Sequence, residues 1–90
     1  MDDKRQAQIN AGQQAARALA DPAMTKAFAD LDDELVKRWR TSRDRDERDR
    51  IWLSISMLGK LKDTLAATAA NGRVTQRQLD EMLEKRPRAA

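Results

Sequence analysis

Helix-breaking residues stand at only a few points of this 90-residue chain, which contains two prolines and three glycines. Between those points, apolar side chains recur at spacings of three and four residues, which is the period of an α-helix. Residues that favour helices, such as alanine, leucine, arginine and glutamate, are common throughout. We therefore predict an all-α fold.

The segment that begins at Asp21 and Pro22 has the clearest helical pattern. Aspartate caps helix N-termini and proline fits the first helical position, so a helix is predicted over about 22–41. Residues 3–20, in front of it, carry few large apolar side chains, which predicts a weaker N-terminal helix. The apolar residues of the stronger helix share one face: Met24, Ala27, Phe28, Leu31, Leu35 and Trp39.

A second long helix is predicted over about 44–71. Asn71 and Gly72 are residue types that accept the left-handed conformation found just beyond helix ends, so the helix is expected to stop there. Thr75 and Gln78 then match a capping box, which predicts a separate short C-terminal helix.

The two long helices, 22–41 and 44–71, are expected to pack as an antiparallel hairpin. At 1.5 Å per residue they are about 30 Å and about 40 Å long, so the second overhangs the first. The run 51–58 has six apolar residues among eight, more than one helix face holds. The first helix, the short C-terminal helix or another subunit must cover this surface. We predict an oligomer, with these residues contacting subunits or partners: Trp52, Leu53, Met57, Leu61 and Leu65.

The size of the chain also limits its core. Ninety residues make one domain at most, so residues 1–86 are predicted to form one helical domain and residues 87–90 a loose tail. Hydrophobic residues are 40% of the chain, but many are alanine and only three residues are aromatic. A thin core makes a marginal monomer, which is a second reason to expect self-association.

The residues that the chain lacks exclude most catalytic centres. Without histidine or cysteine it can form no zinc site of the usual ligand types, no disulfide and no histidine-activated nucleophile. It also has no glycine-rich phosphate loop. The acidic residues at 30–34 are more simply a solvated helix face than a magnesium site. We therefore expect no enzymatic activity, no cofactor and no metal.

Basic residues surround the turn between the two long helices, beside Trp39 and Trp52. Acidic residues interleave with them, and pairs such as Asp44 with Arg48 and Arg45 with Asp49 are expected to form ion pairs. The two tryptophans are expected to pack in the core near the turn; an exposed pair would instead be a binding hot spot. Five arginines are candidates for contacting nucleic-acid phosphates or an acidic partner: Arg40, Arg43, Arg45, Arg48 and Arg50.

No apolar stretch approaches the length of a membrane span, and the beginning of the chain is acidic and has no apolar signal-peptide region. We therefore expect no membrane contact and a cytoplasmic location. The absence of cysteine is consistent with a reducing compartment.

The order and spacing of several features resemble a known group of proteins. These features are Ala20-Asp21-Pro22-Ala23-Met24, Ala27-Phe28, Leu31, Trp39, Ile51-Trp52-Leu53, Asn71-Gly72-Arg73 and Gln78-Leu79. Together they resemble the small helical proteins encoded in the structural-gene region of tailed bacteriophages and prophages, near portal and capsid genes. The resemblance spans roughly residues 17–85 and transfers no site residues.

This resemblance implies a role in virion assembly or genome packaging, in the bacterial host cytoplasm or in the virion itself, with phage or host proteins as partners. Our main hypothesis is thus a non-enzymatic accessory protein that acts by helix-mediated self-association and partner binding. One alternative is a DNA-binding regulator or small packaging subunit that uses the basic turn. Another is a phage inhibitor that occupies a host protein or sequesters a signalling molecule between subunits.

Overall fold

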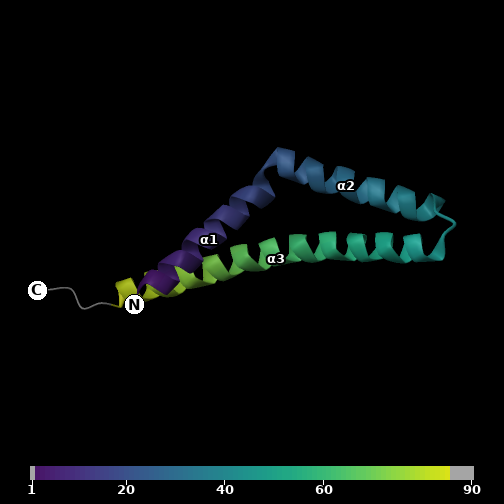
Figure 1. Cartoon of the computed structure of the whole chain (residues 1–90). Coiled ribbons are helices and arrows are strands. Elements are labelled where there is room, and N and C mark those ends of the chain that lie inside the picture. Colours follow the sequence, from purple (N-terminus) through teal and green to yellow (C-terminus); the bar gives the residue numbers. More distant parts are fainter. Residues whose placement is uncertain (1, 86–90) are drawn as a thin grey trace, which may run out of the picture.

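The computed structural model describes residues 2–85, and this part of the chain is helical with no strand. Helix α1 spans Asp2–Ala20, α2 spans Pro22–Thr41 and α3 spans Arg45–Glu84. The three helices outline a long, open triangle, in which α1 leaves the C-terminal half of α3 and α2 returns to its beginning (Figure 1). The all-α prediction is confirmed, and the tail predicted at 87–90 lies outside the described residues.

The two long helices, α2 and α3, each begin with an aspartate cap. The Asp21 carboxylate accepts a hydrogen bond from the Ala23 amide at 2.8 Å, and Pro22 occupies the first turn of α2. The Asp44 carboxylate accepts one from the Asp46 amide at 3.1 Å at the start of α3. Each cap satisfies an amide that has no partner inside its own helix.

The predicted break at Asn71 and Gly72 is wrong. Helix α3 continues through both residues to Glu84, so the last turns of α3 replace the predicted short C-terminal helix. Neither residue has a positive φ, and Thr75, the predicted cap, is buried within the helix. Gly72 faces Gly12 of α1 so closely that a Cβ on either glycine would lie 2.7 Å from the Cα of the other. This glycine therefore allows two helices to approach rather than ending one.

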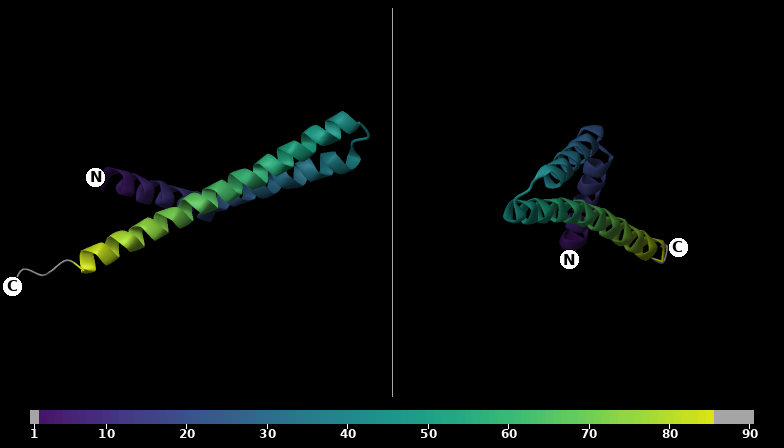
Figure 2. Two further views of the ribbon diagram at one scale, coloured as in Figure 1. Left: turned by 90° about the horizontal axis from the view of Figure 1, so that it is seen from below. Right: turned by 90° about the vertical axis from the view of Figure 1, so that its right-hand side faces the viewer.

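Helix α1 crosses the C-terminal half of α3 (Figure 2), and Gly12 and Gly72 meet at the crossing. Around the two glycines, Ile9 and Ala15 of α1 and Ala69 of α3 are buried. Although the sequence predicts α1 to be the weaker helix, α1 makes more extensive contact with α3 than α2 does. Small residues at a crossing let two backbones come close, and this gives α1 a packing site that its few large side chains do not suggest.

The molecule is elongated and its core is thin. The Cα radius of gyration is 19.8 Å, whereas a compact chain of this length has a value of about 12 Å. Helix α3 has 40 residues and is about 60 Å long. Ile51 and Leu58 of α3 are buried, but α2 contributes no buried residue, and no described side chain is completely withdrawn from solvent.

Candidate functional site

Four of the five predicted contact residues remain exposed on the folded chain. The exposed fractions are 56% for Trp52, 59% for Leu53, 63% for Met57 and 51% for Leu61, whereas Leu65 is half-buried. The broad apolar run 51–58 thus keeps much of its surface in water, as a contact surface requires. Contact with another molecule stays a prediction.

The structure divides these exposed residues between two places. Leu53, Met57 and Leu61 are spaced by four residues, so they follow one another along one side of α3. We call these three residues the apolar stripe. Trp52 points about 100° away from Leu53 around the helix, toward the turn between α2 and α3.

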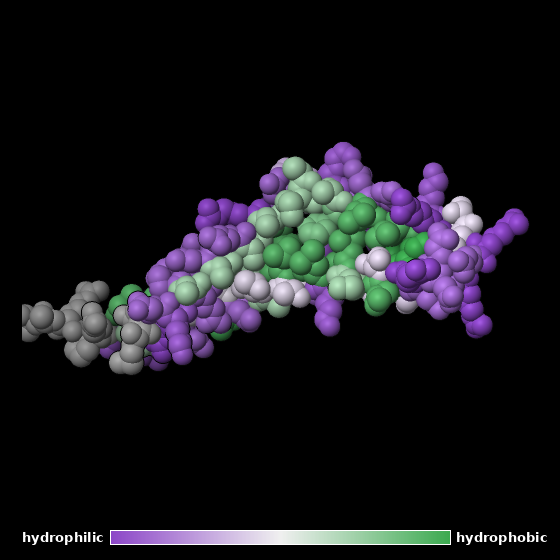
Figure 3. All heavy atoms as spheres, in the orientation of Figure 1, coloured by the Kyte–Doolittle hydropathy of each residue, from purple (hydrophilic) through white to green (hydrophobic). Residues whose placement is uncertain are grey.

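Helix α2 also leaves large apolar side chains exposed. On α2, Met24 and Leu31 are also exposed, and their separation of seven residues places them on one face of that helix. In the space-filling view, hydrophobic side chains gather in the middle of this face, between the three helices, and polar ones cover the end that holds the turn between α2 and α3 (Figure 3). The sequence pattern assigned Met24 and Leu31 to the face buried in the hairpin, and the structure leaves both partly in solvent.

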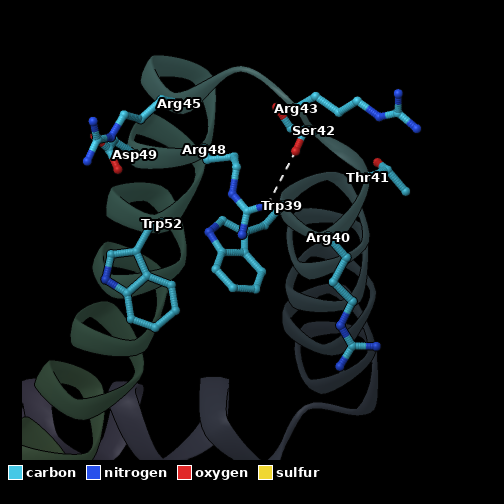
Figure 4. A pocket seen from close by; sticks show the side chains of 9 residues that line it. All are labelled: Trp39, Arg40, Thr41, Ser42, Arg43, Arg45, Arg48, Asp49 and Trp52. Carbon is cyan, nitrogen blue, oxygen red and sulfur yellow. Dashed lines mark hydrogen bonds between the residues drawn. The ribbon is translucent and has the colours of Figure 1, made fainter.

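At the turn, both tryptophans and one arginine form a cluster of contacting side chains. The ring centroids of Trp39 and Trp52 are 6.0 Å apart and the rings are tilted by 46°. The Arg48 guanidinium lies 4.4 Å from the centroid of the Trp39 ring, and its Nη1 donates a hydrogen bond to the Ser42 carbonyl at 3.4 Å (Figure 4). Trp39 is half-buried by this arrangement, whereas Trp52 stays mostly exposed.

A hollow of about 920 Å³ opens beside these three side chains, between the end of α2 and the start of α3. We call it the turn hollow; Trp39 and Trp52 line it, together with Arg40, Arg43, Arg45 and Arg48. Arg43 and Arg45 extend outward on either side of the turn (Figure 4). The structure therefore brings four of the five predicted arginines together. Arg50 lies at a separate hollow of about 590 Å³, which Arg43 also lines.

The ion pairs predicted at the turn are not formed. Asp44 instead caps α3, Arg48 is turned toward Trp39, and Arg50 Nε donates to the backbone carbonyl of Asp46 at 3.4 Å. Among the side chains of residues 3–85, the only ion pairs are Lys26–Asp30 and Glu34–Arg38. Arg40, Arg43 and Arg45 of the turn hollow therefore have no acidic partner among the described side chains, whereas Arg48 packs against Trp39.

The net charge of the chain is concentrated at this end. Residues 37–50 contain seven basic and four acidic residues, a net charge of +3. The whole chain has 18 basic and 15 acidic residues, so the remaining 11 of each kind cancel. The turn thus carries an excess positive charge equal to that of the entire protein.

Two kinds of site are absent from the described part of the chain. No group of three or more acidic side chains among residues 3–85 lies close enough together to hold a metal ion. Neither α1, α2 nor α3 combines the length and apolar character needed to cross a bilayer. The apolar stripe and the turn hollow are therefore the two surfaces from which a function can be argued.

In comparisons with known proteins, no family model, no curated protein and no solved structure matches this chain.

Proposed function

We propose that this protein is a non-enzymatic binding protein that works as a homo-oligomer, with the apolar stripe of α3 at the contact between subunits. In this proposal α2 and the first half of α3 act as an antiparallel hairpin that presents the stripe. The observation that carries the proposal is the unusually large surface that the chain exposes.

The chain exposes 7673 Å², whereas a folded monomer of its mass, 10.2 kDa, exposes about 5300 Å². The six terminal residues outside the described part account for at most about 1000 Å² of the difference, since unfolded chain exposes about 160 Å² per residue. An excess of about 1400 Å² remains, more than the roughly 800 Å² that each partner buries in a stable interface. Self-association supports the fold by burying this surface.

The spacing of the apolar stripe favours a second copy of the chain as the occupant. Leu53 and Leu61 lie four residues before and four residues after Met57. An antiparallel two-fold pairing centred on Met57 therefore places Leu53 of one protomer opposite Leu61 of its partner. Such a surface is complementary to itself, which is the requirement for a symmetric dimer contact.

Analytical ultracentrifugation of the full chain tests this proposal. The natural chain should sediment as an oligomer, and Met57→Lys should shift it to a monomer because a charge at the centre of the stripe is costly to bury. Val74→Lys is the matched control, since Val74 is an exposed apolar residue of α3 outside the stripe. A monomeric natural chain, or equal effects of the two substitutions, would refute the proposal.

The resemblance to phage head-gene proteins supplies the proposed setting, which is virion assembly or genome packaging in the bacterial cytoplasm. An oligomeric helical protein with two binding surfaces suits an accessory role of this kind. Deleting the gene from the phage or prophage that carries it should lower the yield or the DNA content of the particles. Normal yield and normal DNA content would contradict the assembly role.

A further inference from the structure

We infer that the turn hollow binds single-stranded nucleic acid, with a base stacked on Trp52 and the backbone phosphates held by Arg40, Arg43 and Arg45. This inference does not rest on the proposed oligomer, because the hollow is built by one chain at the end of the molecule opposite the crossing of α1 and α3 (Figure 1).

The first part of the argument is the charge of the hollow. Arg40, Arg43 and Arg45 line it and form no ion pair with any acid of residues 3–85, the part of the chain whose side chains the structure describes. Arg43 and Arg45 extend on opposite sides of the turn, so a strand laid across the turn would meet a guanidinium on each side (Figure 4). Arginine forks bind phosphate oxygens in pairs, and the counterions released from the strand add to the affinity.

The second part of the argument is how far the rings of Trp39 and Trp52 are already covered. The Trp39 ring is already covered by the Arg48 guanidinium on one side and contacts Trp52 on another. Trp52 has one neighbour ring and is still 56% exposed, so part of its surface is open to a further planar group. Aromatic side chains beside a positively charged groove are the usual platform on which unpaired bases stack.

The geometry favours a single strand over a duplex. A base can stack on an indole only when it is free of its neighbours, and bases inside a duplex are already stacked. The hollow lies at a connection between two helix ends, so neither helix projects lengthwise from it into a major groove. Its volume of about 920 Å³ lies in the range of pockets that hold organic ligands.

One acidic residue opposes this binding. Asp49 is the only acid that lines the hollow, on the turn of α3 that follows Arg45. Its carboxylate repels the phosphates that the arginines attract. The inference therefore includes a substitution that should strengthen binding, Asp49→Asn, besides those that weaken it.

Fluorescence anisotropy of a short labelled oligothymidylate, titrated with the full chain at several salt concentrations, tests the inference. Trp52→Ala should weaken binding about tenfold with little change in salt dependence, because stacking releases no counterions. Arg43→Ala and Arg45→Ala should each weaken binding. Each should also lower, by about 0.7, the steepness with which the logarithm of the affinity falls with the logarithm of the salt concentration. Asp49→Asn should tighten binding. Arg73→Ala is the matched control, since Arg73 is an exposed arginine of α3 far from the turn.

Several outcomes would overturn the inference. The first is that the oligothymidylate does not bind at low salt. The second is that the Trp52→Ala chain binds as tightly as the natural chain. The third is that Arg73→Ala weakens binding as much as Arg45→Ala does. Tighter binding of a duplex would assign the turn to double-stranded DNA. Equal competition by polyglutamate would assign it to acidic protein surfaces. Far-ultraviolet circular dichroism of each variant confirms that the helices are intact, so that a loss of binding is attributable to the site.

Discussion

Gly12 of α1 and Gly72 of α3 meet backbone to backbone, and a Cβ on either would lie 2.7 Å from the Cα of the other. That Cβ would also lie 3.1 Å from the Thr68 carbonyl oxygen if it were on Gly12, and 3.2 Å from that of Gln8 if it were on Gly72. Neither glycine has a positive φ, so their value lies in the space they leave rather than in backbone freedom. The crossing fixes α1 against the far half of α3.

Replacing either glycine should therefore destabilise the fold. Gly12→Ala and Gly72→Ala place a methyl group against backbone atoms that cannot rotate away, so the two helices must separate. Overpacking of this kind costs about 1–3 kcal/mol, and the higher helix propensity of alanine offsets only part of it. Urea denaturation followed by circular dichroism measures the change.

Gly59 supplies the matched control for this prediction. It lies in the same helix as Gly72, but a Cβ built on it has no neighbour within 4 Å. Gly59→Ala should therefore raise the free energy of unfolding by roughly 0.5–1 kcal/mol, the gain from helix propensity alone. If Gly72→Ala stabilised the chain as Gly59→Ala does, the close crossing would be disproved.

Leu58 and Leu53 of α3 should respond differently to truncation. Leu58 is buried between the helices, so Leu58→Ala should cost about 2–5 kcal/mol, a large part of the stability of a small domain. Leu53 is exposed, so Leu53→Ala should have little effect on a dilute monomer.

The proposed oligomer adds a dependence on concentration to this comparison. If the stripe is a subunit contact, Leu53→Ala should lower the melting temperature by more as the protein concentration rises. The reason is that association stabilises only the folded chain. Leu58→Ala should lower the melting temperature at every protein concentration. Thermal melting over a wide range of protein concentrations measures both, and a concentration-independent Leu53→Ala effect contradicts the contact.

The cap of α3 offers a local test. Asp44→Ala removes the carboxylate that accepts the Asp46 amide, which should cost about 1 kcal/mol, whereas Asp44→Asn keeps an acceptor and should cost less. Asp63→Ala changes the same charge inside α3 without touching a cap and should have a smaller effect. Chemical denaturation compares the three variants; equal losses for Asp44→Ala and Asp63→Ala would show that the cap contributes nothing.

The contact between Arg48 and Trp39 should contribute measurable coupling. A double-mutant cycle with Arg48→Met and Trp39→Phe should give an interaction energy of about 0.5–1 kcal/mol, the range for exposed cation–π pairs. Arg45 lines the same hollow but makes no such contact with Trp39, so the cycle of Arg45→Met with Trp39→Phe should give a value near zero. Similar coupling in the two cycles would point to a general effect of charge.

The local features of the sequence determined where the helices begin. Asp21 with Pro22 and Asp44 act on amides within two residues of themselves, so their role follows from neighbouring residues alone. The same holds for the helical class of the fold, which follows from the spacing of apolar residues and the scarcity of helix breakers. The exposure of Leu53 and Met57 was also foreseeable, because the run 51–58, which contains both, has more apolar residues than one helix face holds.

Only the tertiary structure decided the role of Gly72 and the arrangement of the turn. A glycine after an asparagine fits a helix end and a helix crossing equally well, and the difference lies in Gly12, on another helix. Likewise, the sequence allows Arg48 to pair with Asp44, the cap of the same helix. In the structure the Arg48 guanidinium instead lies 4.4 Å from the centroid of the Trp39 ring of α2. In both cases a contact between segments distant in sequence outweighed a local preference, because a pattern of neighbouring residues carries no information about which surfaces will meet.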